Sequence, residues 1–336
     1  MPALLTKFES TRISNALISA PEAVVDTVLR QKRERNGVSF INDLLQYGVS
    51  SLSLGGLYAL MALGLVIVYG ILRLVNFAYG ELVMVGGYGL LIFGETPLPW
   101  IICAVLSILA ALFAGVLMER VAFRPVRNTS PTTLLITSFA VSNLLQNIAL
   151  LTVSPRPRAP RLPEFFVKSL TVGDLRIKLA DLIALTVSIL ALVVLTVFLR
   201  RTIIGLALRA AADDFTMTRL VGVKANMVIA SAFAVSGFMA GIVAIFWIGR
   251  TGQTYPSVGL QPVLIAFIAS VVGGMSSLKG AVLGGYVLGF LTMGLQTWLP
   301  QGVNNYRDAV LFGIVIVVLL FRPDGLIKPA YSREAR

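Results

Sequence analysis

Long apolar stretches dominate the chain, and polar or charged residues separate them into nine segments. The segments cover residues 47–70, 75–94, 98–118, 132–153, 180–199, 227–248, 259–277, 280–298 and 308–321. Several approach the roughly 20 residues that a helix needs to cross the hydrocarbon core of a membrane. A membrane-spanning barrel would instead show short stretches in which apolar and polar residues alternate. The pattern therefore predicts an all-α fold, a polytopic transmembrane helix bundle with about eight or nine membrane segments.

Glycine interrupts two of these segments, 75–94 and 259–277. We expect one of them to be broken or re-entrant, a feature that often marks a solute pathway. A related pattern, two glycines followed by tyrosine, ends at Tyr88 and again at Tyr286. Two interpretations fit it: an internal repeat that lines the pathway, or close packing of helix backbones. The candidate pathway glycines are Gly86, Gly87, Gly273 and Gly274.

The composition supports the membrane class and narrows the chemistry. Hydrophobic residues make up 57% of the chain and charged residues 13%, whereas about 25% charged residues is typical of soluble domains. The chain has one cysteine, Cys103, and no histidine. We therefore expect no internal disulfide, no catalytic triad, no metal site and no cofactor. Residues 273–280 are glycine-rich but lack the Gly-Lys-Ser/Thr ending of a nucleotide-binding loop, so we expect no ATP binding.

The distribution of positive charge predicts the orientation in the membrane. The formal net charge is +12. Loops 119–131 and 200–224 and the tail from 322 onward fall on one side, and together they hold twelve lysines and arginines. We assign that side to the cytoplasm. The opposite loop, 154–178, is also basic, but a loop of this length crosses with little regard to charge. Since topology explains the charge, we expect contact with membrane lipid and none with nucleic acid.

We expect three regions: an N-terminal extension at 1–38, a transmembrane domain at 39–328 and a C-terminal tail at 329–336. The extension lacks the apolar core of a cleavable signal peptide. It fits either an amphipathic helix lying on anionic lipid or a disordered segment. With nine full crossings and a cytoplasmic C-terminus, this basic extension would lie outside, contrary to the positive-inside rule.

Two polar residues interrupt the second apolar segment, in the sequence Asn76-Phe-Ala-Tyr-Gly-Glu81. Ionisable groups at membrane depth are costly and face protein or a water-filled cavity. Asn76 and Glu81 are therefore candidates for lining a solute pathway or for bonding the end of a broken helix. The alternative is that Glu81 lies near the interface and interacts with the positive end of a helix that begins after Gly80.

A second polar group lies in the fourth segment, at Asn143, Gln146 and Asn147. Their spacing places all three on one side of a helix. They fit hydrogen bonding to a neighbouring helix, the commoner use of such residues, or contact with a solute.

The loop between the fifth and sixth segments, residues 201–224, is charged and alanine-rich. Its composition predicts a solvated helix, and Gly222 has the position of a helix-ending glycine. Such a helix either connects two membrane segments or docks in a groove of a soluble partner.

Several motifs in one order resemble the LivH-type permeases of branched-chain amino-acid ABC importers. They are the hexapeptide at 76–81, Glu119-Arg-Val-Ala-Phe-Arg-Pro-Val-Arg127, the loop from Gly205 to Gly222, the glycine-rich stretch at 272–285 and the closing Arg322-Pro-Asp-Gly325. The resemblance covers residues 40 to 328. In place of the family's usual Glu-Ala-Ala, this chain has Thr216-Met217-Thr218.

The resemblance implies a non-enzymatic, multi-pass subunit of the bacterial inner membrane. Its implied partners are a second, LivM-like permease or another copy of itself, two ATPase subunits and a periplasmic solute-binding protein. It also implies that the 201–224 loop docks on an ATPase. The residues that we map onto this coupling role are Ala212, Asp213, Asp214, Thr218, Arg219, Leu220 and Gly222.

The leading hypothesis from the sequence is therefore a permease for branched-chain or related hydrophobic amino acids. Importers of urea, amides or aromatic acids use related permeases and form one alternative. A stand-alone, ion-coupled secondary transporter is another, for which Glu81 and Asp308 are the available intramembrane acids. An intramembrane enzyme is disfavoured, because no nucleophile arrangement is recognisable.

Overall fold

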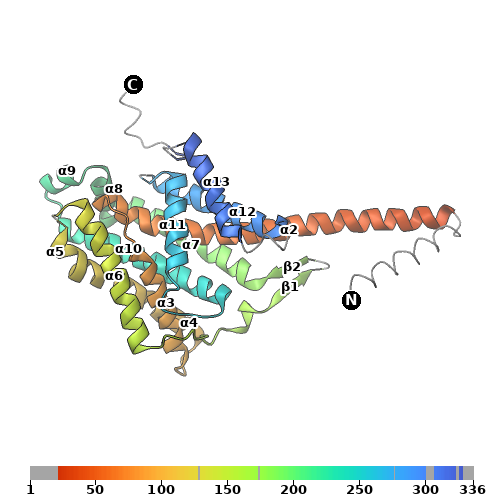
Figure 1. The fold of residues 1–336 in the computed structure, drawn as a ribbon, viewed down its shortest axis with the longest axis horizontal. Helices are drawn as coiled ribbons and strands as arrows, with labels where there is room; N and C mark the ends of the chain where they lie inside the picture. The colour runs from red at the N-terminus through yellow and green to blue at the C-terminus, as the bar shows by residue number, and fades with distance from the viewer. Residues whose placement is uncertain are drawn as a thin grey trace. The chain divides into compact units, whose positions relative to one another are not determined.

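The computed structural model is predominantly helical (Figure 1) and describes residues 22–127, 129–172, 175–275, 277–299, 306–322 and 325–327. It separates into two units. One contains Met1–Gln46 with Thr171–Arg176, and the other contains Tyr47–Leu170 with Ile177–Arg336. All contacts discussed below lie within the second unit. Residues 1–21 and 328–336 are outside the described residues, so the expectations for most of the N-terminal extension and for the C-terminal tail remain predictions.

Each predicted apolar segment lies in a helix, which confirms the all-α prediction. The helices are α2 (Glu22–Leu72), α3 (Tyr79–Gly94), α4 (Trp100–Met118), α5 (Arg124–Val126), α6 (Pro131–Thr152), α7 (Leu179–Arg201), α8 (Ile203–Asp213), α9 (Phe215–Leu220), α10 (Ala225–Thr251), α11 (Leu260–Gly273), α12 (Leu278–Trp298) and α13 (Arg307–Phe321). A π-helical turn, η1 (Glu119–Phe123), joins α4 to α5, and a 3₁₀ turn, η2 (Glu164–Phe166), precedes a hairpin of β1 (Ser169–Val172) and β2 (Leu175–Lys178).

Two helix boundaries differ from the sequence-based expectation. The segment after α4 was expected to be a loop from residue 119, but helical structure continues through η1 and α5, so the span runs from Trp100 to Val126. A π turn accommodates an extra residue without ending the helix. At the other end of the chain, α2 begins at Glu22, so residues 22–38 of the expected extension are helical and continue into the first membrane span.

Among the described residues, six helices are long and apolar enough to cross a membrane. They are Leu44–Leu72, Trp100–Val126, Pro131–Thr152, Leu179–Arg201, Ala225–Thr251 and Leu278–Trp298. Two other apolar helices, α3 and α11, are shorter. They correspond to the two glycine-interrupted segments. The sequence predicted that one of these segments is interrupted, and in the structure both form short helices. The connection to each short helix begins with a residue in the left-handed conformation. This residue is Arg73 before α3, with φ 53°, and Gly252 before α11, with φ 72°.

Burial divides the spanning helices into central and peripheral ones. The apolar window of α2 is 89% buried and that of α10 is 72% buried, whereas the windows of α4, α6 and α7 are only 22% to 33% buried. Apolar side chains that face outward need lipid or another membrane subunit to cover them. The three peripheral helices therefore expose most of the apolar surface that a membrane environment would cover.

Glycine allows α3 to approach its neighbours closely. A Cβ atom added at Gly86 would lie 2.7 Å from the Cβ of Ala244 on α10, and one at Gly87 would lie 2.9 Å from Oγ1 of Thr254. The Ser107 hydroxyl of α4 donates a hydrogen bond to the Gly86 carbonyl at 2.5 Å. Gly86 and Gly87 are buried, and their contacts fit the close-packing interpretation.

A second glycine contact joins α11 to α12. A Cβ atom at Gly273 would lie 1.9 Å from the carbonyl oxygen of Gly280. Gly274 ends α11 with φ +107°, a conformation that residues with a side chain rarely adopt. The chain after α13 pairs with this turn, because the Leu326 N–H donates to the Val272 carbonyl at 2.8 Å. Gly273 and Gly274 therefore form a tight helical hairpin that the C-terminal segment covers.

An ion pair connects three spanning helices. Nη2 of Arg250 on α10 lies 2.6 Å from Oδ1 of Asp181 on α7, and the same atom donates to Oγ of Ser53 on α2 at 3.1 Å. Ser50 donates to the other carboxylate oxygen of Asp181 at 3.0 Å. A mostly buried carboxylate needs such partners, so this network fixes α2, α7 and α10 relative to one another.

Candidate functional site

The two short helices, α3 and α11, begin at the same place. A Cβ atom at Gly80 would lie 2.3 Å from the Gly259 carbonyl oxygen, and one at Gly259 would lie 2.1 Å from the Gly80 carbonyl oxygen. The backbones therefore touch where the first turns of both helices leave N–H groups without partners inside the helix. Two helix N-termini at one point create a region of positive potential inside the bundle.

Glu81 lies in the first turn of α3, beside this meeting point. Its side chain is fully buried, and Oε1 accepts hydrogen bonds from Oγ of Ser142 and from Nε2 of Gln146, both at 2.8 Å. The other carboxylate oxygen, Oε2, has no hydrogen-bond partner among the described residues. The positive helix ends and the two donors stabilise a buried carboxylate at this point.

Asn76 lies in the connection that leads into α3. It is buried, and its Oδ1 accepts a hydrogen bond from the Ala78 N–H at 3.1 Å. Its Nδ2 faces the sulfur of Met118 at 3.8 Å. The contact with Ala78 satisfies a backbone N–H just before α3 begins, so the geometry fits the helix-support interpretation of Asn76.

The structure separates the three polar residues that the sequence grouped on α6. Gln146 reaches Glu81, but Asn143 and Asn147 are exposed and donate to carbonyls of their own helix, at 2.9 and 2.8 Å. Ser142 completes the cluster and was not predicted. It lies four residues before Gln146 and so on the same helix face, but serine is common in membrane helices and does not by itself indicate such a role.

A cavity of about 370 Å³ adjoins this cluster. Gln146 forms part of its wall, together with residues of the two connections that follow α6 and α10. The lining residues are Gln146, Asn147, Leu150, Pro155, Pro157, Tyr255, Pro256 and Ser257. The two connections are joined by hydrogen bonds between Arg158 and Thr254. Gln146 thus contacts the cavity and the buried carboxylate at once.

The 201–224 loop is helical as expected, but it forms two helices, α8 and α9, where the sequence predicted one. The break is at Asp214, whose extended backbone ends α8 and whose side chain accepts a hydrogen bond from the Met217 N–H at 2.9 Å. An aspartate at an N-cap satisfies open N–H groups and so favours a new helix start. Ala212 and Asp213 end α8, whereas Thr218, Arg219 and Leu220 belong to α9.

The end of α9 presents apolar side chains to solvent. Leu220 is 76% exposed and Val221 is 79% exposed. Gly222 then turns the chain with φ +89°, and a Cβ atom there would meet nothing within 4 Å. Near the end of α8, Ala212 lies against Gly70 of α2, and its carbonyl accepts a hydrogen bond from the Arg73 guanidinium at 3.2 Å.

Comparison with known proteins places this arrangement in a family. The family model described as "Branched-chain amino acid transport system / permease component" matches residues 48–319. The permease protein BraD of Pseudomonas aeruginosa is 34% identical over 296 residues, 84% of this chain and 95% of that protein. LivH of Escherichia coli K12 is 35% identical over 298 residues, with the same coverage. The probable permease protein LivH of Methanocaldococcus jannaschii is 27% identical over 292 residues, 83% of this chain and 91% of that protein.

Proposed function

This chain belongs to the family of branched-chain amino acid transport permeases, and on that premise we propose that it is the translocating subunit of an ATP-driven importer in the bacterial inner membrane. The observation that carries the proposal is the match over residues 48–319, which includes the spanning helices from α4 to α12. The solute is a branched-chain or related hydrophobic amino acid. The chain is a transport component, and ATP hydrolysis belongs to partner subunits.

The assembly contains ATPase subunits and a solute-binding protein, as expected of an ABC importer permease. We further propose a second, LivM-like permease as the membrane partner. The weakly buried outer faces of α6 and α7 support this pairing, because a partner of the same class would cover them. A pairing with a second copy of this chain would use the same faces.

The ATPase docks at the segment from Ala212 to Gly222. Exposed apolar residues at the end of α9 support this assignment, since Leu220 and Val221 gain by burial in a groove. The contact of Ala212 with the end of α2 supports it as well, because a displacement of α8 reaches the most buried spanning helix directly.

The solute pathway passes the meeting point of α3 and α11. Discontinuous helices whose N-termini meet near the middle of a bundle are a common design of transporter binding sites. The cavity beside Gln146 and the incompletely satisfied carboxylate of Glu81 support this position. The 154–178 connection would then lie outside, where a binding protein delivers the solute.

Uptake into proteoliposomes tests the proposed function. The full complex should accumulate labelled leucine only when the binding protein is present and ATP is available to the ATPases. A panel of hydrophobic amino acids, urea, amides and aromatic acids, tested for binding to the cognate binding protein, identifies the solute class. Uptake by this chain alone, driven by an ion gradient and indifferent to ATP, would establish the secondary-transporter alternative instead.

A further inference from the structure

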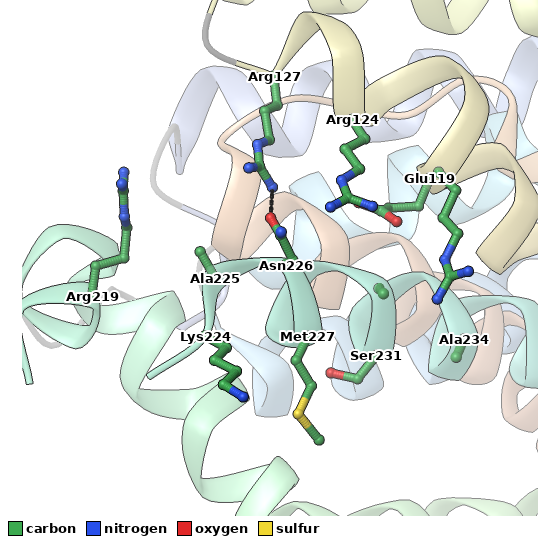
Figure 2. Close-up of a pocket in the computed structure, with 12 residues that line it drawn as sticks. Glu119, Arg124, Arg127, Arg219, Lys224, Ala225, Asn226, Met227, Ser231 and Ala234 are labelled. Atoms are coloured by element: carbon green, nitrogen blue, oxygen red, sulfur yellow. Dashed lines mark hydrogen bonds between the residues drawn. The ribbon is translucent and has the colours of Figure 1, made fainter. Parts of the chain in front are cut away.

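A basic pocket lies where the helical segment after α4 approaches the start of α10 (Figure 2). Its volume is about 780 Å³. Five cationic side chains and a single carboxylate contribute to its lining. These residues are Arg120, Arg124, Arg127, Arg219, Lys224 and Glu119. The pocket is separate from the cavity beside Gln146. Of its six charged residues, Arg219 alone also belongs to the proposed coupling segment from Ala212 to Gly222.

Most of the charge in this pocket is not neutralised within the described part of the chain. Arg127 donates a hydrogen bond to Oδ1 of Asn226, while the other four cations make no hydrogen bond or ion pair to a described residue. Glu119 is 1% exposed, and its Oε1 likewise has no described partner. Figure 2 shows Arg124 and Arg127 extending toward the start of α10. Cations held together in this way repel one another, so an anion bound among them would be stabilised.

The pocket lies at the depth of lipid headgroups. Arg120 follows Trp100 by 20 residues, and a helix of that length spans about 30 Å, which is about the thickness of the hydrocarbon core. Lys224 immediately precedes the spanning helix α10. The basic residues therefore lie where two spanning helices leave the apolar layer, on the side that we assign to the cytoplasm.

Exposed apolar side chains form a stripe along α4 and its π-helical continuation η1. Its members recur every four residues and are each exposed by 49% to 71%: Ile101, Val105, Leu109, Phe113, Leu117 and Val121. Successive members are neighbours on the helix surface, about 6 Å apart and rotated by about 40° around the axis, so the stripe winds around the helix as it rises. The last of them, Val121, is the neighbour of Arg120 in the sequence, so the stripe reaches the level of the pocket along the helix axis without lining it.

We propose that the pocket binds the phosphate-bearing headgroup of an anionic phospholipid, whose acyl chains lie along the α4 stripe. Lysines and arginines recognise phosphate by charge and hydrogen bonding, and basic pockets between membrane helices on the cytoplasmic side are suited to such headgroups. A soluble protein would fill the charged pocket but would not cover an apolar stripe that extends about 30 Å through the membrane. The proposal rests on the proposed orientation but not on the identity of the solute.

The test measures lipid binding to the full-length chain, purified with the subunits that accompany it. Native mass spectrometry in the presence of phosphatidylglycerol, phosphatidylcholine or glycerol 3-phosphate compares an anionic lipid, a zwitterionic lipid and a free phosphate ester. The variant is Arg120→Gln with Arg124→Gln. The matched control is Arg200→Gln with Arg209→Gln, which removes the same charge from exposed positions that do not line the pocket.

We expect phosphatidylglycerol to bind in preference to both other probes. The pocket variant should bind it about 30-fold more weakly and the control variant should be unchanged, because each lost contact to an anionic surface weakens binding about fivefold. Equal binding of the two phospholipids, or an equal loss in both variants, would overturn the proposal. If glycerol 3-phosphate binds as tightly as the lipid, the site is one for a free oxyanion. If the pocket variant keeps its lipid but loses the ATPases, the pocket is a protein-docking surface. Tight binding of glycerol 3-phosphate and selective loss of the ATPases would each overturn the lipid assignment.

Discussion

Removing the Glu81 carboxylate should loosen the contact between α3 and α6. In Glu81→Ala, the Ser142 hydroxyl and the Gln146 amide both lose their acceptor, and each bond measured 2.8 Å. A hydrogen bond between membrane helices contributes about 0.6 kcal/mol on average and up to about 1.7. A charged acceptor lies toward the upper end of such values. Two bonds therefore give an expected loss of about 1–3 kcal/mol in the free energy of unfolding.

Unfolding of the purified protein in detergent measures this loss, and a double-mutant cycle assigns it to the cluster. Ser142→Ala in the Glu81→Ala background should cost much less than in the wild type, because its acceptor is already gone. Asn147→Ala is the matched control, since its side chain is exposed and bonds only its own helix. It should change stability by less than about 0.5 kcal/mol. If Glu81→Ala were as stable as the wild type, or if the two changes were simply additive, the cluster would not join α3 to α6.

Three further predictions concern the coupling loop, the orientation and the energy source. Gly222→Glu or Leu220→Glu should leave membrane insertion intact but abolish uptake and weaken ATPase co-purification, because an unpaired charge buried in the docking interface costs several kcal/mol. Asp213→Ala, at an exposed position, should have a milder effect. Normal uptake by both glutamate variants would remove the coupling assignment. With Cys103 replaced, a cysteine near Arg124 should resist an impermeant thiol reagent in intact cells while one near Arg158 reacts; the reverse labelling would invert the topology. The purified chain alone should bind no ATP by calorimetry, and measurable affinity would contradict its role as a passive permease.

The sequence predicts the helices of this fold well because membrane helices carry their signal locally. A continuous apolar run of about 20 residues is sufficient to predict a span. Glycine within a run marked α3 and α11 as the two candidates for interruption, although only one of them was expected to be interrupted. The left-handed turn at Gly222 was also predictable from the local sequence, since a φ of +89° strongly favours glycine. The break at Asp214 was missed, because an aspartate in a charged loop fits a helix surface as well as an N-cap.

The contacts within the bundle could not be predicted in this way. Glu81 is 61 residues from Ser142, and Asp181 is 69 residues from Arg250. Which polar residues meet depends on how each helix is rotated about its axis, and neighbouring helices determine that rotation. Gln146 and Asn147 are adjacent in the sequence, yet only Gln146 faces α3. Hydrophobic pattern alone does not distinguish them, since the exposed side of α6 is apolar as well.

One short stretch of chain connects the proposed coupling loop to the proposed pathway. Gly70 and Arg73, at the end of α2, contact Ala212 of the loop. Only seven residues separate Arg73 from Glu81 at the start of α3. Residues 73–78 of this connection are not helical and include the left-handed Arg73. A small displacement of α8 therefore passes through few flexible backbone torsions before it reaches Gly80 and its contact with α11. Contiguity is not coupling, but it identifies the residues between which a coupling free energy should be measured.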